Sequence, residues 1–237
     1  MTEIAPIAHI RSPFATKFGI PRQSNILMEI TSEIVFTPDY RVSEALRGIE
    51  DFDYLWLIWQ FSENLRSDWS PTVRPPRLGG NKRMGVFATR SSFRPNALAL
   101  SSVRLLEVRH NTPDGPILVV QGADLMDGTP IFDIKPYLPY TDSHPEARSG
   151  FAPAPADHLL EVRCDEQWLA LLPPKYQAAL FDILAHDPRP SYHNDPSRQY
   201  GFLFANHEIR FQVFPTHLQV LSISKKEASS ETNVNDC

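Results

Sequence analysis

The chain has 237 residues and a net charge of −5, a length that suits one large domain or one domain with a smaller companion. Hydrophobic residues make up 42% and charged residues 22%, which excludes disordered and collagen-like proteins. No apolar run approaches the ~18 residues that span a bilayer, and the N-terminus lacks a secretory signal pattern. Cys164 and Cys237 have no CxxC partner, which excludes a thiolate zinc site. We therefore expect a cytoplasmic protein with reduced thiols.

Short segments of β-branched, aromatic or alternating residues recur through the first 140 residues, separated by Pro, Gly and Asn. The stretch 52–61 (FDYLWLIWQF) is almost continuously apolar, which predicts a central strand buried on both faces. Residues 43–48 predict one helical turn. Many short strands without long intervening helices favour a β-barrel or sandwich over an alternating α/β sheet. Strands are expected at 7–10, 26–36, 52–61, 84–89, 97–109, 117–125 and 131–134.

The composition changes at 139–157, where Pro, Ala and Ser dominate and indicate a linker. Beyond it, the pattern predicts a strand at 158–163, a helical stretch at 166–186 that Pro173 and Pro174 interrupt, and strands at 201–214 and 217–224. The predicted fold is mainly β: an N-terminal antiparallel β-barrel with a smaller C-terminal α+β domain. The expected boundaries are 1–145 for the barrel, 146–157 for the linker, 158–224 for the α+β domain and 225–237 for a polar tail.

Basic residues concentrate in one part of this acidic chain. No acidic residue lies between Asp68 and Glu107, where seven basic residues occur. Such an island can neutralise phosphates, and arginine can also hold a carboxylate. The alternative is a set of solvated loop charges that pair with acids elsewhere. The island therefore predicts binding of an anion or a nucleic acid without choosing between them. Its members are Arg74, Arg77, Lys82, Arg83, Arg90, Arg94 and Arg104.

Other motifs narrow the possibilities. Residues 79–85 (GGNKRMG) match neither a dinucleotide-binding nor a Walker loop, and the chain has no HExxH or GxSxG motif. The eight histidines show no metal-ligand spacing, so we expect no metal. Residues 127–130 (DGTP) predict a turn. Spacing alone favours an ordinary hairpin with capping aspartates there, and the alternative is a carboxylate that accepts hydrogen bonds from a ligand.

Several motifs occur together in one order: HIRSPF at 9–14, PRQ at 21–23, PPRLGG at 75–80, MGVFATRS at 84–91, FRPN at 93–96, DGTP at 127–130 and DIKPY at 133–137. This succession resembles the TsaA-like (TrmO, YaeB) family of S-adenosylmethionine-dependent tRNA methyltransferases. The region after 157 is similar to the small C-terminal domain of bacterial members, and DPRP at 187–190 is its most recognisable piece.

The resemblance implies a homodimeric β-barrel methyltransferase. It implies methyl transfer to N6 of threonylcarbamoyladenosine, beside the anticodon of threonine tRNA, with the anticodon arm as partner. It also implies a set of residues that bind S-adenosylmethionine. Two departures are Ser62-Glu63, where members often have His-Gln, and 95–99 (PNALA), where they often have PNPIG. Carried over by position, the donor-binding residues are Pro21, Arg22, Gln23, Ser24, Asn25, Ser62, Glu63, Arg90, Leu100, Asp124, Leu125, Met126 and Asp127.

On this interpretation, Arg90 holds the carboxylate of the methyl donor, and an aspartate of the 124–127 turn accepts from its ribose or adenine. An acylated N6 is a poor nucleophile, so a general base would assist, and Asp133 and Tyr137 are the candidates. Five other residues of the island would contact tRNA phosphates. Trp56, Trp59 and Phe61 are expected in the core instead of forming a stacking platform. The predicted tRNA-binding residues are Arg74, Arg77, Lys82, Arg83 and Arg94.

Two alternatives remain open. A non-catalytic β-barrel could hold an anionic small molecule or RNA. An enzyme of the same barrel could also use S-adenosylmethionine with a different acceptor. The Ser62-Glu63 departure is the sequence feature that leaves room for either.

Overall fold

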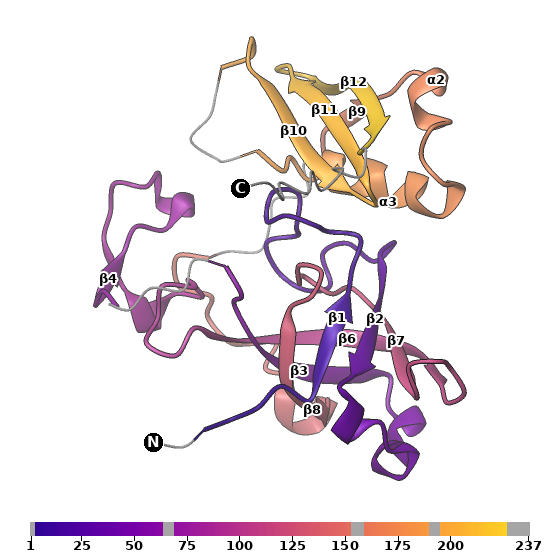
Figure 1. Ribbon diagram of the computed structural model, residues 1–237. Helices are drawn as coiled ribbons and strands as arrows, with labels where there is room; N and C mark the ends of the chain where they lie inside the picture. Colours follow the sequence, from indigo (N-terminus) through magenta and orange to yellow (C-terminus); the bar gives the residue numbers. More distant parts are fainter. Residues whose placement is uncertain (1–2, 64–68, 153–158, 190–194, 227–237) are drawn as a thin grey trace, which may run out of the picture.

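The computed structural model describes residues 3–63, 69–152, 159–189 and 195–226, apart from the side chain of Arg77 (Figure 1). The described chain forms a closed antiparallel β-barrel and a separate four-stranded sheet with short helices. The predicted mainly β fold, with an N-terminal barrel and a smaller C-terminal α+β domain, is confirmed.

The barrel has strand order β1-β2-β7-β6-β3-β8, and every pair within it is antiparallel. Side chains of β3 alternate between buried and half-buried, so the prediction that 52–61 is buried on both faces is wrong. In a closed barrel one face of each strand lines the interior and the other faces outward. Trp59 therefore lies in the core, while Trp56 lies on the outer wall. The strands are β1 (Ala8–Arg11), β2 (Thr31–Phe36), β3 (Tyr54–Gln60), β6 (Leu98–Arg109), β7 (Ile117–Gln121) and β8 (Pro130–Pro136).

The connection between β3 and β6 projects from the side of the barrel as an arm, defined here as residues 69–95 (Figure 1). Its two short strands, β4 (Thr72–Val73) and β5 (Met84–Gly85), pair with each other. The strand predicted at 84–89 is shorter than expected, because the chain turns into a 3-10 helix at Val86–Ala88. The arm also contains the 3-10 turn Pro76–Leu78.

Other short helices decorate the barrel. The helical turn predicted at 43–48 is confirmed as the 3-10 helix Ser43–Leu46, between two further 3-10 turns at Pro38–Tyr40 and Ile49–Asp51. Helix α1 (Pro139–Asp142) lies in the stretch predicted to be a linker.

The C-terminal sheet has strand order β10-β11-β12-β9, with β9 parallel to β12. The strand predicted at 201–214 is a hairpin instead, because Ala205 and Asn206 both adopt left-handed backbone conformations, with φ of 49° and 62°. The helical stretch divides before Pro173-Pro174, as predicted, and Pro174 opens the second helix. The elements are β9 (Glu161–Arg163), α2 (Glu166–Leu169), α3 (Pro174–Ala185), β10 (Gln199–Phe204), β11 (His207–Val213) and β12 (His217–Lys225).

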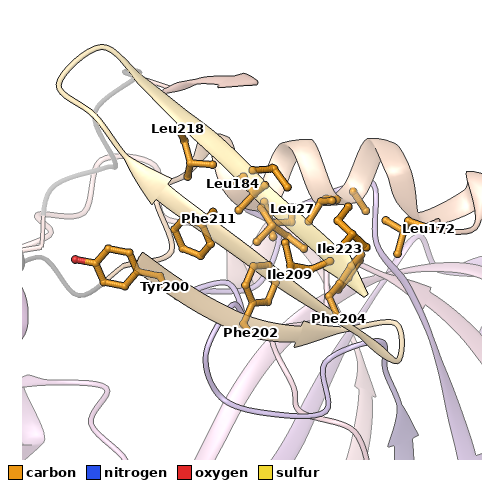
Figure 2. Close-up of a cluster of buried hydrophobic side chains, with 14 of the residues drawn as sticks. Leu27, Leu172, Leu184, Tyr200, Phe202, Phe204, Ile209, Phe211, Leu218 and Ile223 are labelled. Atoms are coloured by element: carbon orange, nitrogen blue, oxygen red, sulfur yellow. The ribbon is translucent and has the colours of Figure 1, made fainter. Parts of the chain in front are cut away.

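The core of the C-terminal domain lies between its sheet and α3 (Figure 2). Residues of the β1–β2 connection enter this core: Phe14, Leu27 and Ile30 are buried there beside strand residues such as Phe204. The rings of Phe14 and Phe204 lie 5.6 Å apart. The strand predicted at 26–36 therefore begins only at Thr31, since the chain before it packs against the other domain.

Candidate functional site

The loop 21–25, within the β1–β2 connection, is attached to the barrel at Asn25. The Asn25 backbone N–H donates to the Gly122 carbonyl at 2.9 Å, and its side-chain Nδ2 donates to the Ser102 hydroxyl at 2.8 Å. Asn25 has a φ of 60°, a left-handed conformation that Asn tolerates better than most residues. Two separate segments of the chain therefore fix the end of this loop.

Gly122 lets the loop approach the barrel closely. Its φ is 80°, and an added Cβ would lie 2.6 Å from Asn25 Oδ1 and 3.3 Å from the Asn25 backbone. Asn25 Oδ1 is itself buried without a hydrogen-bond partner among the described residues. The site therefore contains an acceptor that the protein leaves unsatisfied.

Asp124 is the final acceptor in a chain of hydrogen bonds. Trp59 Nε1 donates to the Ser101 hydroxyl at 2.9 Å, and that hydroxyl donates to Asp124 Oδ1 at 2.6 Å. Burial raises the pKa of Asp124, while the Ser101 hydroxyl, the nearby Arg90 charge and the Ser24 backbone N–H act to lower it. A carboxylate held this way is oriented and partly desolvated, as a ligand-binding acceptor should be.

Arg90 joins the loop from the arm. One guanidinium nitrogen of Arg90 donates to the side-chain oxygen of Gln23. Arg22 extends the other way and donates to the Arg189 backbone carbonyl of the C-terminal domain at 3.1 Å. We call the assembled group, Arg22, Gln23, Ser24, Asn25, Arg90 and Asp124, the loop cluster. The structure thus brings together six of the predicted donor-binding residues.

Other predicted donor-binding residues have different surroundings. Leu125 is fully buried in the barrel core, Leu100 is 53% exposed on the wall, and Pro21 and Met126 are half-buried. Asp127 accepts from the Ser12 backbone N–H at 2.9 Å, which matches the capping role that spacing favoured.

Ser62 and Glu63 occupy a separate position, just beyond the end of β3. Glu63 forms an ion pair with Lys17 at 3.2 Å. Lys17 belongs to the β1–β2 connection but lies outside the loop 21–25. Among the described hydrogen bonds and ion pairs, none links Ser62 or Glu63 to the loop cluster.

Asp133 and Tyr137 lie on the outer wall of the barrel. Asp133 pairs across the sheet with Ile58, which pairs with Leu100. Its carboxylate contacts Lys135 Nζ at 2.8 Å, and the Tyr137 ring packs 5.5 Å from that of Trp56. Within the described residues, no hydrogen bond or ion pair links either residue to the loop cluster. The strand β3 separates them from β6, to which the loop is attached.

The arm presents six of the seven residues of the basic island, and Arg104 lies on β6. Arg74 and Lys82 are exposed, Arg83 donates to the Thr72 hydroxyl at 3.2 Å, and Arg94 donates to the Thr89 carbonyl at 3.2 Å. In the described part of the chain, none of these four cations forms an ion pair with an acid. The side chain of Arg77 lies outside the described residues. This arrangement favours binding of an external anion over pairing with acids elsewhere in the chain.

Sequence reasoning missed Ser101, Ser102 and Arg189. Ser101 is 2% exposed and shares the inward face of β6 with the buried Val103. A polar residue at an inward position of a strand is a detectable signal, since it needs a partner inside the protein. The contact of Arg189 could not be predicted from the sequence around it, because its carbonyl accepts from Arg22, which lies far away in the chain.

The described residues contain neither a metal-binding cluster nor a membrane-spanning helix. Across 3–63, 69–152, 159–189 and 195–226, no group of three or more His, Cys, Asp or Glu residues is arranged to hold a metal ion. None of the helices in these ranges is long and apolar enough to cross a membrane.

Comparison with known protein families gives two matches that together cover most of the chain. Residues 9–143 match the tRNA-methyltransferase O N-terminal domain, and residues 159–226 match the TrmO C-terminal domain. The first match contains the barrel and the arm, and the second contains the four-stranded sheet and its helices.

Individual relatives agree with these matches. The chain is 40% identical over 228 residues to the tRNA (adenine(37)-N6)-methyltransferase of Escherichia coli (strain K12), covering 93% of this chain and 97% of the relative. It is 44% identical over 162 residues to an enzyme of the same name from Eikenella corrodens, covering 68% and 91%. The crystal structure of TrmO from Pseudomonas aeruginosa superposes with a TM-score of 0.72 at 31% identity, covering 94% of this chain and 99% of that one.

Proposed function

Because this chain belongs to the tRNA-methyltransferase O family, we propose that it transfers a methyl group from S-adenosylmethionine to N6 of threonylcarbamoyladenosine in threonine tRNA. The modified base would be the one beside the anticodon. We place this activity in the cytoplasm. The observation that carries the proposal is the loop cluster, in which a cation and a partly desolvated carboxylate lie together.

The loop cluster fits the chemistry of the methyl donor. S-adenosylmethionine supplies an activated methyl group on its sulfonium sulfur, together with a carboxylate, an amino group, a ribose and an adenine. Arg90 would hold the carboxylate, for which its planar fork is suited. Asp124 would accept from the ribose hydroxyls or the adenine amine.

The chemistry asks little of the protein beyond positioning. With the methyl group already activated, holding the acceptor nitrogen in line with it supplies most of the acceleration. Asp133 and Tyr137 stay our candidates for removing the N6 proton. If Asp133→Asn and Tyr137→Phe both keep full turnover, neither residue is the base.

The arm would bind the anticodon arm of the tRNA. Its support is the exposed, acid-free set of cations on one projecting segment (Figure 1), a typical electrostatic footprint of a nucleic-acid-binding surface. We also propose that the protein acts as a homodimer. An exposed aromatic pair on the arm supports this, since Trp69 and Phe87 are 51% and 72% exposed with ring centroids 6.0 Å apart.

Donor binding provides the direct test of this assignment. Calorimetry with S-adenosylmethionine should give a saturable heat for the unaltered chain, and Arg90→Lys should weaken binding about tenfold by losing the bidentate contact. Absence of binding by the unaltered chain would favour the alternative, a barrel that holds an anionic molecule or RNA without catalysis. Donor binding without methylation of threonine tRNA would favour a different acceptor.

A further inference from the structure

The loop 21–25 joins two domains. Its C-terminal end is attached to the barrel through Asn25, which contacts Gly122 and Ser102. The residues on both sides of the loop pack into the C-terminal domain: Phe18 and Ile20 precede it, and Ile26 and Leu27 follow it. A donor-binding loop on the barrel is thus supported mainly by the other domain.

The packing on the N-terminal side of the loop is tight. Phe18 stacks on Phe211 at 6.4 Å and meets Phe202 edge-on at 6.2 Å. Gly19 has a φ of 95°, and an added Cβ would lie 2.4 Å from the Phe202 ring. The side chains of the C-terminal sheet therefore restrict the path of the backbone that leads into the loop.

One contact reaches the loop itself. Arg22 donates to the backbone carbonyl of Arg189 at 3.1 Å. That carbonyl lies in a turn which Asp187 orders, because both Asp187 carboxylate oxygens accept from Arg189 Nε, at 3.0 and 2.9 Å. The Asp187 and Arg189 side chains are only 33% and 20% exposed, so solvent screens this pair less than a surface pair.

We propose that the C-terminal domain sets the geometry of the methyl-donor site, with Asp187 and Arg189 as positioning residues that act through Arg22. The Asp187–Arg189 pair fixes the carbonyl that receives the Arg22 guanidinium. Arg22 is next to Gln23, which accepts from Arg90, and the loop continues to Ser24, whose N–H faces Asp124. Losing the pair would loosen this arrangement without removing any group that touches the donor. The inference rests on the proposed function, because it takes the loop cluster as the donor site.

The test compares Asp187→Asn with a matched control. Asn keeps the size of the side chain and tolerates the left-handed φ of 51° at this position, so the change removes mainly the charge. Glu161→Gln removes the same kind of carboxylate–guanidinium pair, Glu161 with Arg163 at 2.9 Å, from the same domain. Calorimetry should show S-adenosylmethionine binding about three- to tenfold weaker in Asp187→Asn and unchanged in Glu161→Gln.

A second readout does not depend on donor binding. Hydrogen exchange at the Asn25 amide, which donates to the Gly122 carbonyl, and at the adjacent Ser24 amide should accelerate in Asp187→Asn while the barrel strands keep their protection. Arg189→Lys, which removes the Nε donor, should reproduce both effects. In steady state, KM for S-adenosylmethionine should rise more than KM for tRNA.

Distinct results would contradict the inference. Equal donor affinity and equal loop exchange in Asp187→Asn, Arg189→Lys and the unaltered chain would overturn it, as would a rise confined to KM for tRNA. Failure of the unaltered chain to bind S-adenosylmethionine would instead overturn the proposed function, so the two failures are distinguishable.

Discussion

At the scale of single residues, the candidate site depends on a close approach between two segments. Gly122 and Asn25 both adopt left-handed backbone conformations, and they face each other with no space for an extra methyl group. The same approach places Asn25 so that it bonds to Ser102 through its side chain. The geometry of the loop 21–25 is therefore set by the absence of a side chain at position 122.

Gly122→Ala should test this close approach. The new Cβ would collide with Asn25, so we expect a loss of about 1–3 kcal/mol of unfolding free energy together with weaker donor binding. Urea unfolding and calorimetry measure the two effects.

Gly48→Ala is the matched control for this change. Gly48 has a similar φ of 83°, but an added Cβ would meet nothing within 4 Å. The control should therefore lose about 1–2 kcal/mol of unfolding free energy through backbone strain alone, and its donor binding should be unchanged. Equal loss of donor binding in both variants would mean that strain alone, and not the collision with Asn25, is responsible.

Asp124→Asn should separate stability from binding. Burial raises the pKa of Asp124 above its ordinary value of 3.8. A carboxyl whose pKa is higher in the folded state binds more protons when folded, so its contribution to stability falls as the pH rises from 3.8 through the folded pKa. The variant cannot ionise, so it should melt at least as high as the unaltered chain at neutral pH, with the difference shrinking as the pH falls toward the ordinary pKa.

The same variant should bind S-adenosylmethionine about tenfold more weakly, because the substitution replaces a charged acceptor with a neutral one. Thermal melts across the pH range and calorimetry at neutral pH measure the two effects. A lower melting temperature at neutral pH would show that the Ser101–Asp124 hydrogen bond matters more than the cost of burying the charge.

At the scale of elements, the arm is the segment that we propose binds the nucleic acid. The cations of Arg74 and Lys82 are exposed and form no ion pair with an acid in the described part of the chain. Each neutralised phosphate releases counterions, so these residues should govern the salt dependence of tRNA binding.

Reversing two of these charges, in the double variant Arg74→Glu with Lys82→Glu, should weaken tRNA binding. The slope of the logarithm of the binding constant against the logarithm of the salt concentration should become shallower by about two, one for each phosphate that is no longer neutralised. Donor binding should be unchanged. The control is Arg148→Glu with Lys175→Glu, which makes the same change in net charge on exposed residues outside the arm. Equal effects of the two double variants on tRNA binding would show that net charge, and not the position of the arm cations, is responsible. A parallel loss of donor binding would show that the arm residues have a structural role.

Elements with strong local patterns were predictable. The apolar runs of β3 and β7 predict strands, and Pro173-Pro174 predicts the break in the helical stretch at the start of α3. The hairpin of β10 and β11 was missed because Ala205-Asn206 lacks the glycine that usually marks such a turn.

The candidate site was predictable only in part. The resemblance selected Gln23, Arg90 and Asp124, which the fold does bring together. The placement of Phe14 and Leu27 in the C-terminal core depends on contacts between residues far apart in the sequence, and no local pattern encodes them.

At the scale of the whole molecule, the two domains share a core. Phe14 is fully buried, its ring packs on Phe204, and the Ala205 N–H donates to the Pro13 carbonyl at 2.9 Å. Segments that belong to one domain by sequence are therefore structural parts of the other. Shared burial of this kind couples the stability of the two domains.

Phe14→Ala should expose this coupling. A cavity in a shared core costs about 3–5 kcal/mol, and the unaltered chain should unfold in a single transition whereas the variant separates into two. Calorimetry measures the transitions. Two transitions in the unaltered chain would contradict the coupling.

The loop cluster and the arm together make, on our proposal, a methyltransferase for threonylcarbamoyladenosine in tRNA. The most direct test is methyl incorporation from labelled S-adenosylmethionine into two pools of threonine tRNA, one carrying the threonylcarbamoyl group and one lacking it. We predict label in the modified pool alone, at N6 of the base beside the anticodon. Label in neither pool, or equal label in both, would contradict the proposal.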